Sequence, residues 1–220
     1  MLSVQSFVNQ PVNSNCYVLF DKEHGNDCII VDPGSRDEQE LVAFIDEEAL
    51  SPKYIILTHE HFDHCWGVNA LVKLYRIPVV CSSLCADAIK DKKRNCSVFY
   101  DNLGFVIEHE TISVESLGDC LLFMEDEIEF YHTPGHTEAS ISFIVDKYLF
   151  TGDTLIKDEN TVTKLPTGSV ECLKTSVEEI KKLKGGGLKV CPGHGEGFAL
   201  DGYDLHICWE GKRNEEYSYI

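Results

Sequence analysis

The sequence predicts a single α/β domain, and three observations point to it. Segments with the periodicity of strands and segments with the periodicity of helices alternate in both halves of the chain. Its 220 residues are enough for one substantial hydrophobic core. Apolar residues make up 43% and charged residues 25%, as in ordinary globular proteins, and no repeat or low-complexity linker divides the chain. We therefore expect one domain that covers residues 1–220.

The first part of the chain is rich in predicted strands. Short apolar and β-branched runs, separated by turn-forming residues, predict a β meander at 2–8, 16–20 and 27–31. Asp32-Pro33-Gly34 ends the third run, and residues 37–50 then carry apolar side chains at the spacing of an amphipathic helix. A buried strand at 54–57 and a helix from about 66 to 75 follow.

The rest of the chain alternates in the same way. The patterns predict strands at 77–81, 127–131, 140–145, 148–151 and 188–191, and helices at 83–90 and 169–183. Between these, the stretch up to about residue 126 is charged and poorly periodic, so it predicts no regular element. The aromatic-bearing tail from residue 197 could pack over a sheet edge, line a substrate pocket or bind a second subunit.

The charge of the chain bears on its partners and its compartment. Acidic side chains outnumber basic ones 37 to 19, for a formal net charge of -18. Such a field repels phosphate backbones and anionic membrane surfaces, so we expect a small-molecule substrate and neither nucleic acid nor membrane as a partner. The N-terminus lacks a basic and apolar leader, and no segment reaches the ~18 apolar residues of a membrane span. We therefore expect a cytoplasmic protein; its oligomeric state is open.

The cysteines fit a reducing compartment. Ten are scattered through the chain without CxxC pairs, unlike the dense framework of a small secreted domain. Cys16, Cys28 and Cys81 lie in apolar strand-like runs, where a free thiol acts as a small hydrophobe. We expect these cysteines to be buried and reduced.

Four potential metal ligands lie within six residues, where a predicted strand runs into a loop. They are His59, His61, Asp63 and His64. Neutral imidazole and carboxylate are the usual ligands of zinc and related divalent metals. In an extended segment His59, His61 and Asp63 would point to one side. One histidine could be an ordinary buried or surface residue, but several buried titratable groups need the compensation that a metal supplies.

Three further polar residues each follow a predicted strand and sit beside a glycine. They are His136 in Thr-Pro-Gly-His, Asp153 in Thr-Gly-Asp-Thr and His194 in Cys-Pro-Gly-His. Glycine permits unusual backbone angles and close approach, which suits a ligand presented at the end of a strand. Taken singly, the three segments could also be ordinary turns.

In these residues the chain resembles the metallo-β-lactamase superfamily, and within it glyoxalase II and its small relatives. The resemblance runs from about residue 16 to 194 and rests on the Asp-Pro-Gly turn, the HxHxDH segment, His136, Asp153 and His194. It implies a four-layer αββα sandwich with two metals at one edge. The predicted alternation of strands and helices agrees with two sheets covered by helices.

The resemblance also implies a role for each ligand. His59, His61 and His136 would hold one metal, Asp63, His64 and His194 the second, and Asp153 would bridge both. The metals are expected to be zinc, with iron or manganese as alternatives. A hydroxide between them would attack the scissile carbonyl, and Asp63 would also take or deliver a proton. Asp32 could orient a ligand or simply form a turn, while Glu60 and Cys65 are expected to lie outside the site.

Two departures from glyoxalase II concern the substrate. The usual Gly-Arg-x-Asp element appears here as Thr161-Val162-Thr163-Lys164, and only 26 residues follow His194, too few for a separate helical glutathione-binding domain. Persulfide dioxygenases, which use one iron, are similar and also normally carry the missing element. We therefore predict a binuclear hydrolase of a small thioester or ester, with a mononuclear iron persulfide dioxygenase as the alternative.

Other classes fit less well. Aspartate at position 153, where one major type of zinc β-lactamase has cysteine, disfavours that type. The charge disfavours a metallo-β-lactamase nuclease, because its substrate is a polyanion. A catalytically inactive binding module would have lost ligands, and none is missing. The hypothesis that the seven candidate ligands form one metal site fails if His136 or His194 lies more than about 10 Å from the HxHxDH segment, given metal–ligand bonds of about 2.0–2.2 Å.

Overall fold

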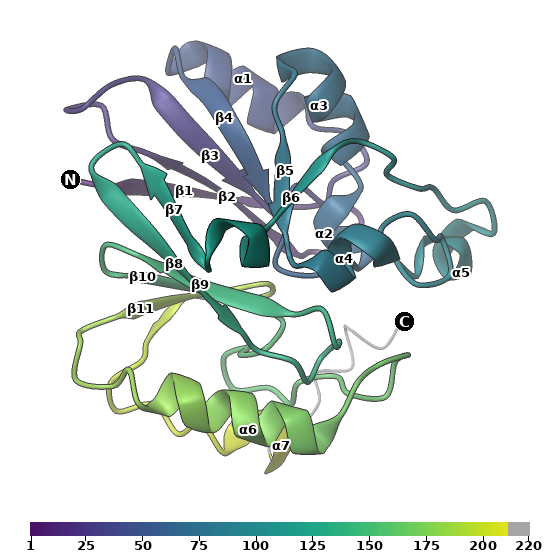
Figure 1. Cartoon of the computed structure of the whole chain (residues 1–220), viewed down its shortest axis with the longest axis vertical. Coiled ribbons are helices and arrows are strands. Elements are labelled where there is room, and N and C mark those ends of the chain that lie inside the picture. The colour runs from purple at the N-terminus through teal and green to yellow at the C-terminus, as the bar shows by residue number, and fades with distance from the viewer. Residues whose placement is uncertain (211–220) are drawn as a thin grey trace.

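Two six-stranded sheets lie face to face at the centre of the molecule (Figure 1). The computed structural model describes residues 1–210. The first sheet contains, in spatial order, β1 (Ser3–Val8), β2 (Asn15–Phe20), β3 (Asp27–Val31), β4 (Ser51–Ile56), β5 (Val79–Cys81) and β6 (Thr111–Ser113). The second contains β12 (Phe198–Ala199), β11 (Lys189–Pro192), β10 (Tyr148–Gly152), β9 (Ile141–Val145), β8 (Asp126–His132) and β7 (Cys120–Phe123).

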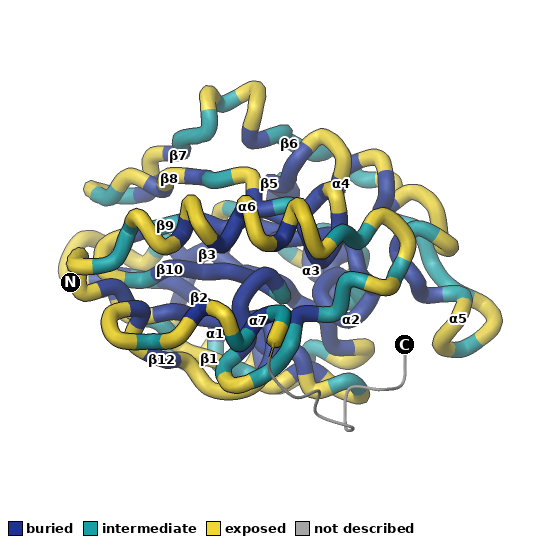
Figure 2. Tube along the Cα trace, turned by 90° about the horizontal axis from the view of Figure 1, so that it is seen from below, coloured by how far each residue is buried: buried dark blue, intermediate teal, exposed yellow. Residues whose placement is uncertain are grey.

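Helices cover the outer faces of both sheets (Figures 1 and 2). Those of the first half are α1 (Gln39–Glu47), α2 (Phe62–Cys65), α3 (Val68–Tyr75), α4 (Ser83–Ala88) and α5 (Ser97–Asp101). A single 3₁₀ turn, η1 (Val114–Leu117), precedes β7, and the second half adds α6 (Val170–Lys181) and α7 (Ile207–Glu210). The order helix, sheet, sheet, helix confirms the predicted four-layer αββα sandwich.

Three apolar cores separate the four layers. Side chains of β2, β3 and β4 alternate between two of them: Val18 and Ile30 pack under α1 and α3, whereas Leu19 and Ile29 face the second sheet. The third core joins the second sheet to α6. A strand that is buried on both faces reads as a continuous apolar run, which explains the Cys-Ile-Ile-Val sequence of β3.

The sheet topology brings several strand ends to one edge of the sandwich. β3, β4 and β5 run parallel, so their carboxyl ends lie together. In the second sheet β8 and β10 are both antiparallel to β9, and β11 is parallel to β10. The carboxyl ends of β8, β10 and β11 therefore share an edge as well. Hydrogen bonds between the sheets, Ile141 N to Thr58 O at 2.8 Å and Asn15 N to Gly193 O at 2.6 Å, join the two edges.

The structure adds elements that the sequence patterns did not predict. The stretch between α4 and β8 contains α5, β6, η1 and β7, all of five residues or fewer, which is too short for a periodic pattern. The described part of the tail packs on the second sheet: β12 pairs with β11, and Leu205 and Cys208 are buried beneath it. Of the three roles predicted for the tail, this agrees with packing at a sheet edge. Tyr217 and Tyr219 lie outside the described residues, and one domain over 1–220 stays a prediction.

All ten cysteines are free thiols, and Cys16, Cys28 and Cys81 are buried as predicted. Across residues 1–210, none of the helices has the length and apolar character needed to cross a bilayer.

Candidate metal centre

The joined edge of the two sheets carries all seven of the candidate ligands. His59 follows β4, His136 follows β8, Asp153 follows β10 and His194 follows β11. The five histidines and Asp63 are each at most 5% exposed, and the side chain of Asp153 is 11% exposed. No candidate lies apart from the others, so the distance criterion stated above is met.

The HxHxDH segment differs in shape from the prediction. It is extended only as far as His61, whose φ of -61° and ψ of 145° precede the first turn of α2. Asp63 and His64 lie on that helical turn, which also begins earlier than the helix predicted from about residue 66. The prediction that Asp63 continues an extended segment is therefore wrong. The turn brings the ligand atoms of Asp63 and His64 close to that of His194, while the His64 ring also lies beside the His59 ring, with centroids 4.3 Å apart.

The first group of ligand atoms comes from His59, His61 and His136. One ring nitrogen from each lies within 4.8 Å of the others. His61 Nδ1 and His136 Nε2 are 2.8 Å apart, and the rings of His59 and His136 have centroids separated by 4.8 Å. This spacing suits three imidazoles that share one tetrahedral metal.

The second group comes from Asp63, His64 and His194, whose ligand atoms also lie within 4.8 Å of one another. His194 Nε2 is 3.3 Å from Asp63 Oδ2. Asp153 lies between the two groups: its Oδ2 is 3.6 Å from His136 Nε2 and 3.5 Å from His194 Nε2, and its Oδ1 is 3.4 Å from His64 Nε2.

Asp32 orients two of the histidines. Its carboxylate accepts hydrogen bonds from Thr58 N at 2.8 Å and Thr58 Oγ1 at 2.6 Å, and its Oδ2 is 3.2 Å from His64 Nδ1. Since the Thr58 hydroxyl donates to Asp32, its oxygen can accept from His59 Nδ1, 3.1 Å away. Both rings thereby carry their proton on Nδ1, which leaves Nε2 as the ligand atom. Asp32 is therefore both a turn residue and a positioning residue.

Two further contacts that hold ligands were not predicted. His136 Nδ1 donates to the main-chain carbonyl of Val162 at 2.7 Å, which leaves its Nε2 facing His61. Glu60 points away from the ligand atoms and accepts a hydrogen bond from Thr137 Oγ1 at 2.9 Å. This bond ties the HxHxDH segment to the residue after His136. The contact of His136 with the Val162 carbonyl could not be predicted, because a main-chain carbonyl has no residue identity. The contact of Glu60 could have been expected, because a glutamate between two ligands is buried and needs a hydrogen-bond partner.

The two groups differ in charge. Burial, together with the neighbouring histidines, lowers the pKa of His59 and lowers that of His61 to about 3. These rings are therefore neutral, as metal ligation requires. Burial also disfavours the charged form of His64, but the carboxylates of Asp63 and Asp153 outweigh it and raise its pKa to about 10.

Several buried polar atoms at this edge make no hydrogen bond. Among the described residues they include His59 Nε2, Asp63 Oδ1, His64 Nε2 and Asp153 Oδ1. A buried polar atom without a partner costs about 1–3 kcal/mol, and these four all point into the cluster of candidate ligands. Divalent cations would satisfy them, so the residues present fit a metal centre.

The turn before His194 leaves no space for a side chain at Gly193. A Cβ atom there would lie 2.1 Å from Asp153 Oδ1 and 2.8 Å from His64 Cε1. We expect Gly193→Ala to displace Asp153 and to lower metal content and activity by at least about tenfold. Elemental analysis of the purified variant would measure this. Gly186→Ala is the control for an added methyl group, since Gly186 is exposed, lies outside the left-handed region, and a Cβ there would come no closer than 3.2 Å to another atom. Full metal occupancy in Gly193→Ala would contradict the close packing.

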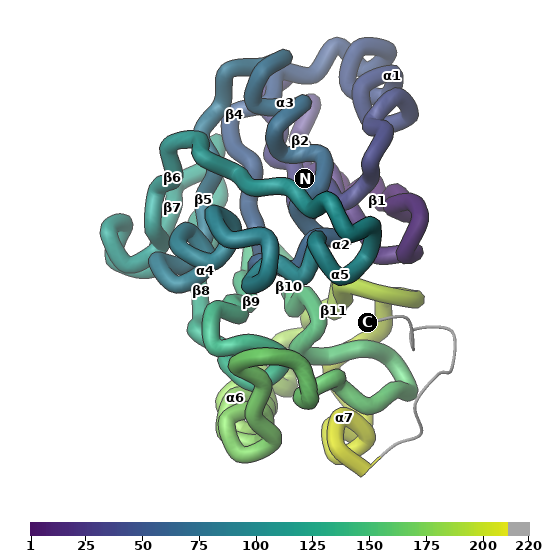
Figure 3. The backbone as a smooth tube through the Cα atoms, turned by 90° about the vertical axis from the view of Figure 1, so that its right-hand side faces the viewer, coloured from purple at the N-terminus to yellow at the C-terminus, as the bar shows by residue number. Residues whose placement is uncertain are grey.

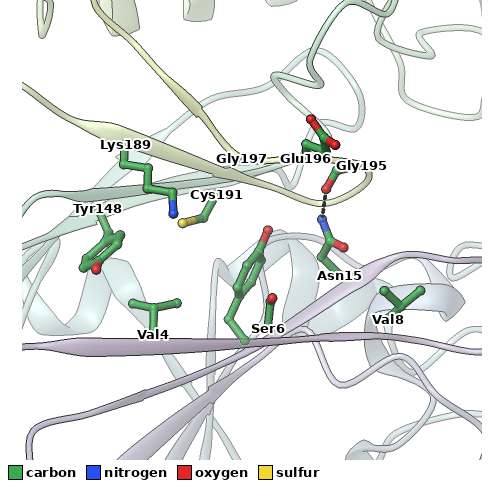
Figure 4. A pocket seen from close by; sticks show the side chains of 11 residues that line it. Val4, Ser6, Val8, Asn15, Tyr148, Lys189, Cys191, Gly195, Glu196 and Gly197 are labelled. Carbon is green, nitrogen blue, oxygen red and sulfur yellow. Dashed lines mark hydrogen bonds between the residues drawn. The ribbon is translucent and has the colours of Figure 1, made fainter.

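Asn15 holds this turn from the other side. Its Nδ2 donates to Pro192 O at 3.0 Å and to Gly195 O at 2.9 Å (Figure 4). A cavity of about 360 Å³ lies here between β1, β2 and β11, and none of the seven candidate ligands lines it. His132 and His206 stay outside the centre, since they approach the surface carboxylates of Glu115, Asp119 and Asp204.

Comparisons with known proteins agree with this architecture. The family model described as the metallo-beta-lactamase superfamily matches residues 9–194. An uncharacterized protein of Mycobacterium leprae is 31% identical over 84% of this chain and 88% of its own length. A hydroxyacylglutathione hydrolase of Prochlorococcus marinus is 30% identical over 82% of this chain and 65% of its own length.

Two solved structures are similar throughout. The BLEG-1 B3 metallo-beta-lactamase aligns with a TM-score of 0.82 and 27% identity, covering 90% of this chain and 94% of that one. The protein TTHA1623, in a di-iron-bound form, aligns with a TM-score of 0.72 and 26% identity, covering 89% and 94%. With the clustered histidines and aspartates and the matching family model, the chain belongs to the metallo-β-lactamase superfamily.

Proposed function

We propose that the protein is a binuclear metal-dependent hydrolase of a small thioester or ester. The observation that carries this proposal is that the ligand atoms form two groups of three, linked by Asp153, which also groups with His59 and His64. His59, His61 and His136 would hold one divalent cation, and Asp63, His64 and His194 the other. Asp153 would contact both.

When bound, such cations polarise a carbonyl and lower the pKa of water from 15.7 to about 7, which supplies a nucleophile at neutral pH. The protein contributes the orientation of the ligands. The Asp32–Thr58–His59 chain and the Val162 carbonyl fix which nitrogen of each ring faces inward. Asp63 presents Oδ2 to His194 Nε2 at 3.3 Å. Whichever of its carboxylate oxygens does not hold a cation would accept or return a proton beside the substrate.

The substrate class is supported by the relatives of this chain and by residues 161–164, which stand where glyoxalase II has Gly-Arg-x-Asp. Identity of 30% to a hydroxyacylglutathione hydrolase supports a thioester or ester. At Thr161-Val162-Thr163-Lys164 the chain lacks the arginine of that element, but the main chain at Val162 still positions His136. The hydrolytic centre is thus retained while the groups that would select glutathione differ.

The first test is elemental analysis paired with an S-lactoylglutathione and simple-thioester hydrolysis assay on the same sample. We expect about two metals per chain and hydrolysis that is lost on chelation and restored by zinc, iron or manganese. His194→Ala should lower the content to about one metal and reduce kcat/KM by at least about a hundredfold. His206→Ala is the matched control, because His206 is exposed and lies outside the centre.

One alternative outcome would replace this proposal. One iron per chain, no hydrolysis, and oxygen consumption with glutathione persulfide would identify a mononuclear dioxygenase. The convergence of Asp63, His64 and His194 on a second position favours the hydrolase, because a mononuclear site has no use for a second complete set of ligands.

A further inference from the structure

Large apolar side chains are exposed together on one short segment. Within α5 and the turn after it, Phe99 is 68% exposed, Tyr100 41% and Leu103 72%. Only nine large apolar residues are exposed in the described chain, so a third of them fall within five positions. Single exposed apolar residues need no explanation, but a cluster of this kind marks a binding surface. We call these three residues the α5 rim.

The α5 rim lies beside the proposed metal centre. Asn95 O, just before α5, accepts a hydrogen bond from Phe62 N at 2.8 Å. The ring of Tyr100 packs on Phe62, with centroids 5.1 Å apart, and Phe62 lies between His61 and Asp63 in the chain. α5 accordingly lies next to α2 in Figure 3.

A second contact joins the same segment to the opposite side of the centre. Arg94 Nη2 is 3.5 Å from Glu138 Oε1, two residues beyond His136. The segment from Arg94 to Tyr100 therefore contacts both ligand-bearing loops.

Packed aromatic rings lie beneath the α5 rim. Trp66 lies against Phe62 at 5.5 Å and stacks on Phe105 at 5.5 Å, with 23° between the ring planes. Asp101 Oδ1 accepts hydrogen bonds from Leu103 N at 3.0 Å and Gly104 N at 2.8 Å, which closes the turn after α5. Phe99 and Leu103 are thus held on an ordered turn while their own side chains remain exposed.

We propose that the α5 rim binds the apolar acyl chain of the substrate, so that the enzyme prefers esters or thioesters of hydrocarbon-chain acids to those of acetate. This inference rests on the proposed hydrolase function and specifies its substrate class. A substrate held at the metal centre would lie beside the loops that this segment contacts, so a long acyl chain could reach Phe99 and Leu103 while an acetyl group could not. A second copy of the chain is the weaker occupant, because a stable dimer buries about 800 Å² per partner and the net charge of -18 repels another copy.

The first measurement compares N-acetylcysteamine thioesters of acetate and octanoate, whose leaving group is neutral, by the loss of thioester absorbance. We expect the wild type to favour octanoate. The double variant Phe99→Ala/Leu103→Ala should lose about tenfold more kcat/KM for octanoate than for acetate, since apolar contact area is removed. Leu122→Ala is the matched control, because Leu122 is 71% exposed on β7. Its replacement should leave the ratio of kcat/KM for octanoate to that for acetate unchanged.

A second measurement does not depend on turnover. The chain has two tryptophans, Trp66 and Trp209, so a Trp209→Phe background leaves Trp66 as the reporter beneath the rim. Octanoate should change Trp66 fluorescence at concentrations at least about tenfold below acetate, in metal-free protein as well, and the double variant should abolish the difference.

The outcomes separate the two hypotheses. Absence of any hydrolysis together with selective octanoate binding would overturn the hydrolase but keep the rim as an acyl-binding surface. Hydrolysis without chain-length preference, and equal binding of octanoate and acetate, would overturn the rim alone. A concentration-dependent dimer that the double variant dissociates would assign the surface to a second copy and would also refute the acyl site.

Discussion

Asp153→Asn is expected to reduce kcat/KM by about a hundredfold to a thousandfold and to lower the metal content below two per chain. The Asp153 carboxylate lies within 3.6 Å of ring nitrogens from both ligand groups, namely those of His136, His64 and His194. An amide has nearly the same size but removes the negative charge that offsets two cations. Side-chain volume is preserved, so the loss reports charge and ligation. Steady-state kinetics and elemental analysis on one preparation measure both effects.

Asp146→Asn is the matched control for this variant. The side chain of Asp146 is exposed, and the residue lies in the turn before β10. Asp153 follows the other end of the same strand. Replacement of Asp146 should leave metal content and kcat/KM unchanged. Retention of two metals and of most activity in Asp153→Asn would show that the two cations do not share this residue.

Asp32→Ala is expected to lower the free energy of unfolding of the metal-free protein by about 3–4 kcal/mol. Asp32 is 2% exposed, and its loss would leave Thr58 N, Thr58 Oγ1 and His64 Nδ1 without their acceptor. Each buried donor left without a partner costs about 1–3 kcal/mol, with partial relaxation. In a chain of this length the midpoint of thermal unfolding should fall by about 10 °C. Urea denaturation and thermal melts in the presence of a chelator measure the effect.

The backbone at Asp32 needs its own control. Its φ is 49°, in the left-handed region that alanine disfavours. Asp146 has a φ of 52° and an exposed side chain, so Asp146→Ala isolates the cost of the backbone. Asp32→Asn should keep an acceptor for Thr58 N and most of the stability, yet weaken metal binding about 10- to 100-fold. Equal destabilisation by Asp32→Ala and Asp146→Ala would refute the hydrogen-bonding role.

Sequence reasoning placed nine of the twelve described strands and the candidate ligands, because both leave local patterns. The apolar runs at β3 and β10 are long enough to show burial. His136, Asp153 and His194 each follow a strand and lie beside a glycine, and the other four ligands lie within six residues after β4. The carboxyl ends of parallel strands meet at one edge, so the order of strands and ligands in the chain already implied their convergence. Between α4 and β8 the sequence did not predict β6 or β7, because these strands have only three and four residues.

What the sequence alone determined is therefore the fold class and the identity of the side chains that meet at one edge. Only the tertiary structure decided how they are oriented and what surrounds them. His136 takes its orientation from a carbonyl 26 residues away, Asn15 secures a turn 180 residues away, and the segment from Arg94 to Tyr100 contacts both ligand-bearing loops, at Phe62 and at Glu138. Main-chain carbonyls have no residue identity, and contacts across such separations leave no periodicity, because local patterns record only the burial of each residue relative to its neighbours in the chain.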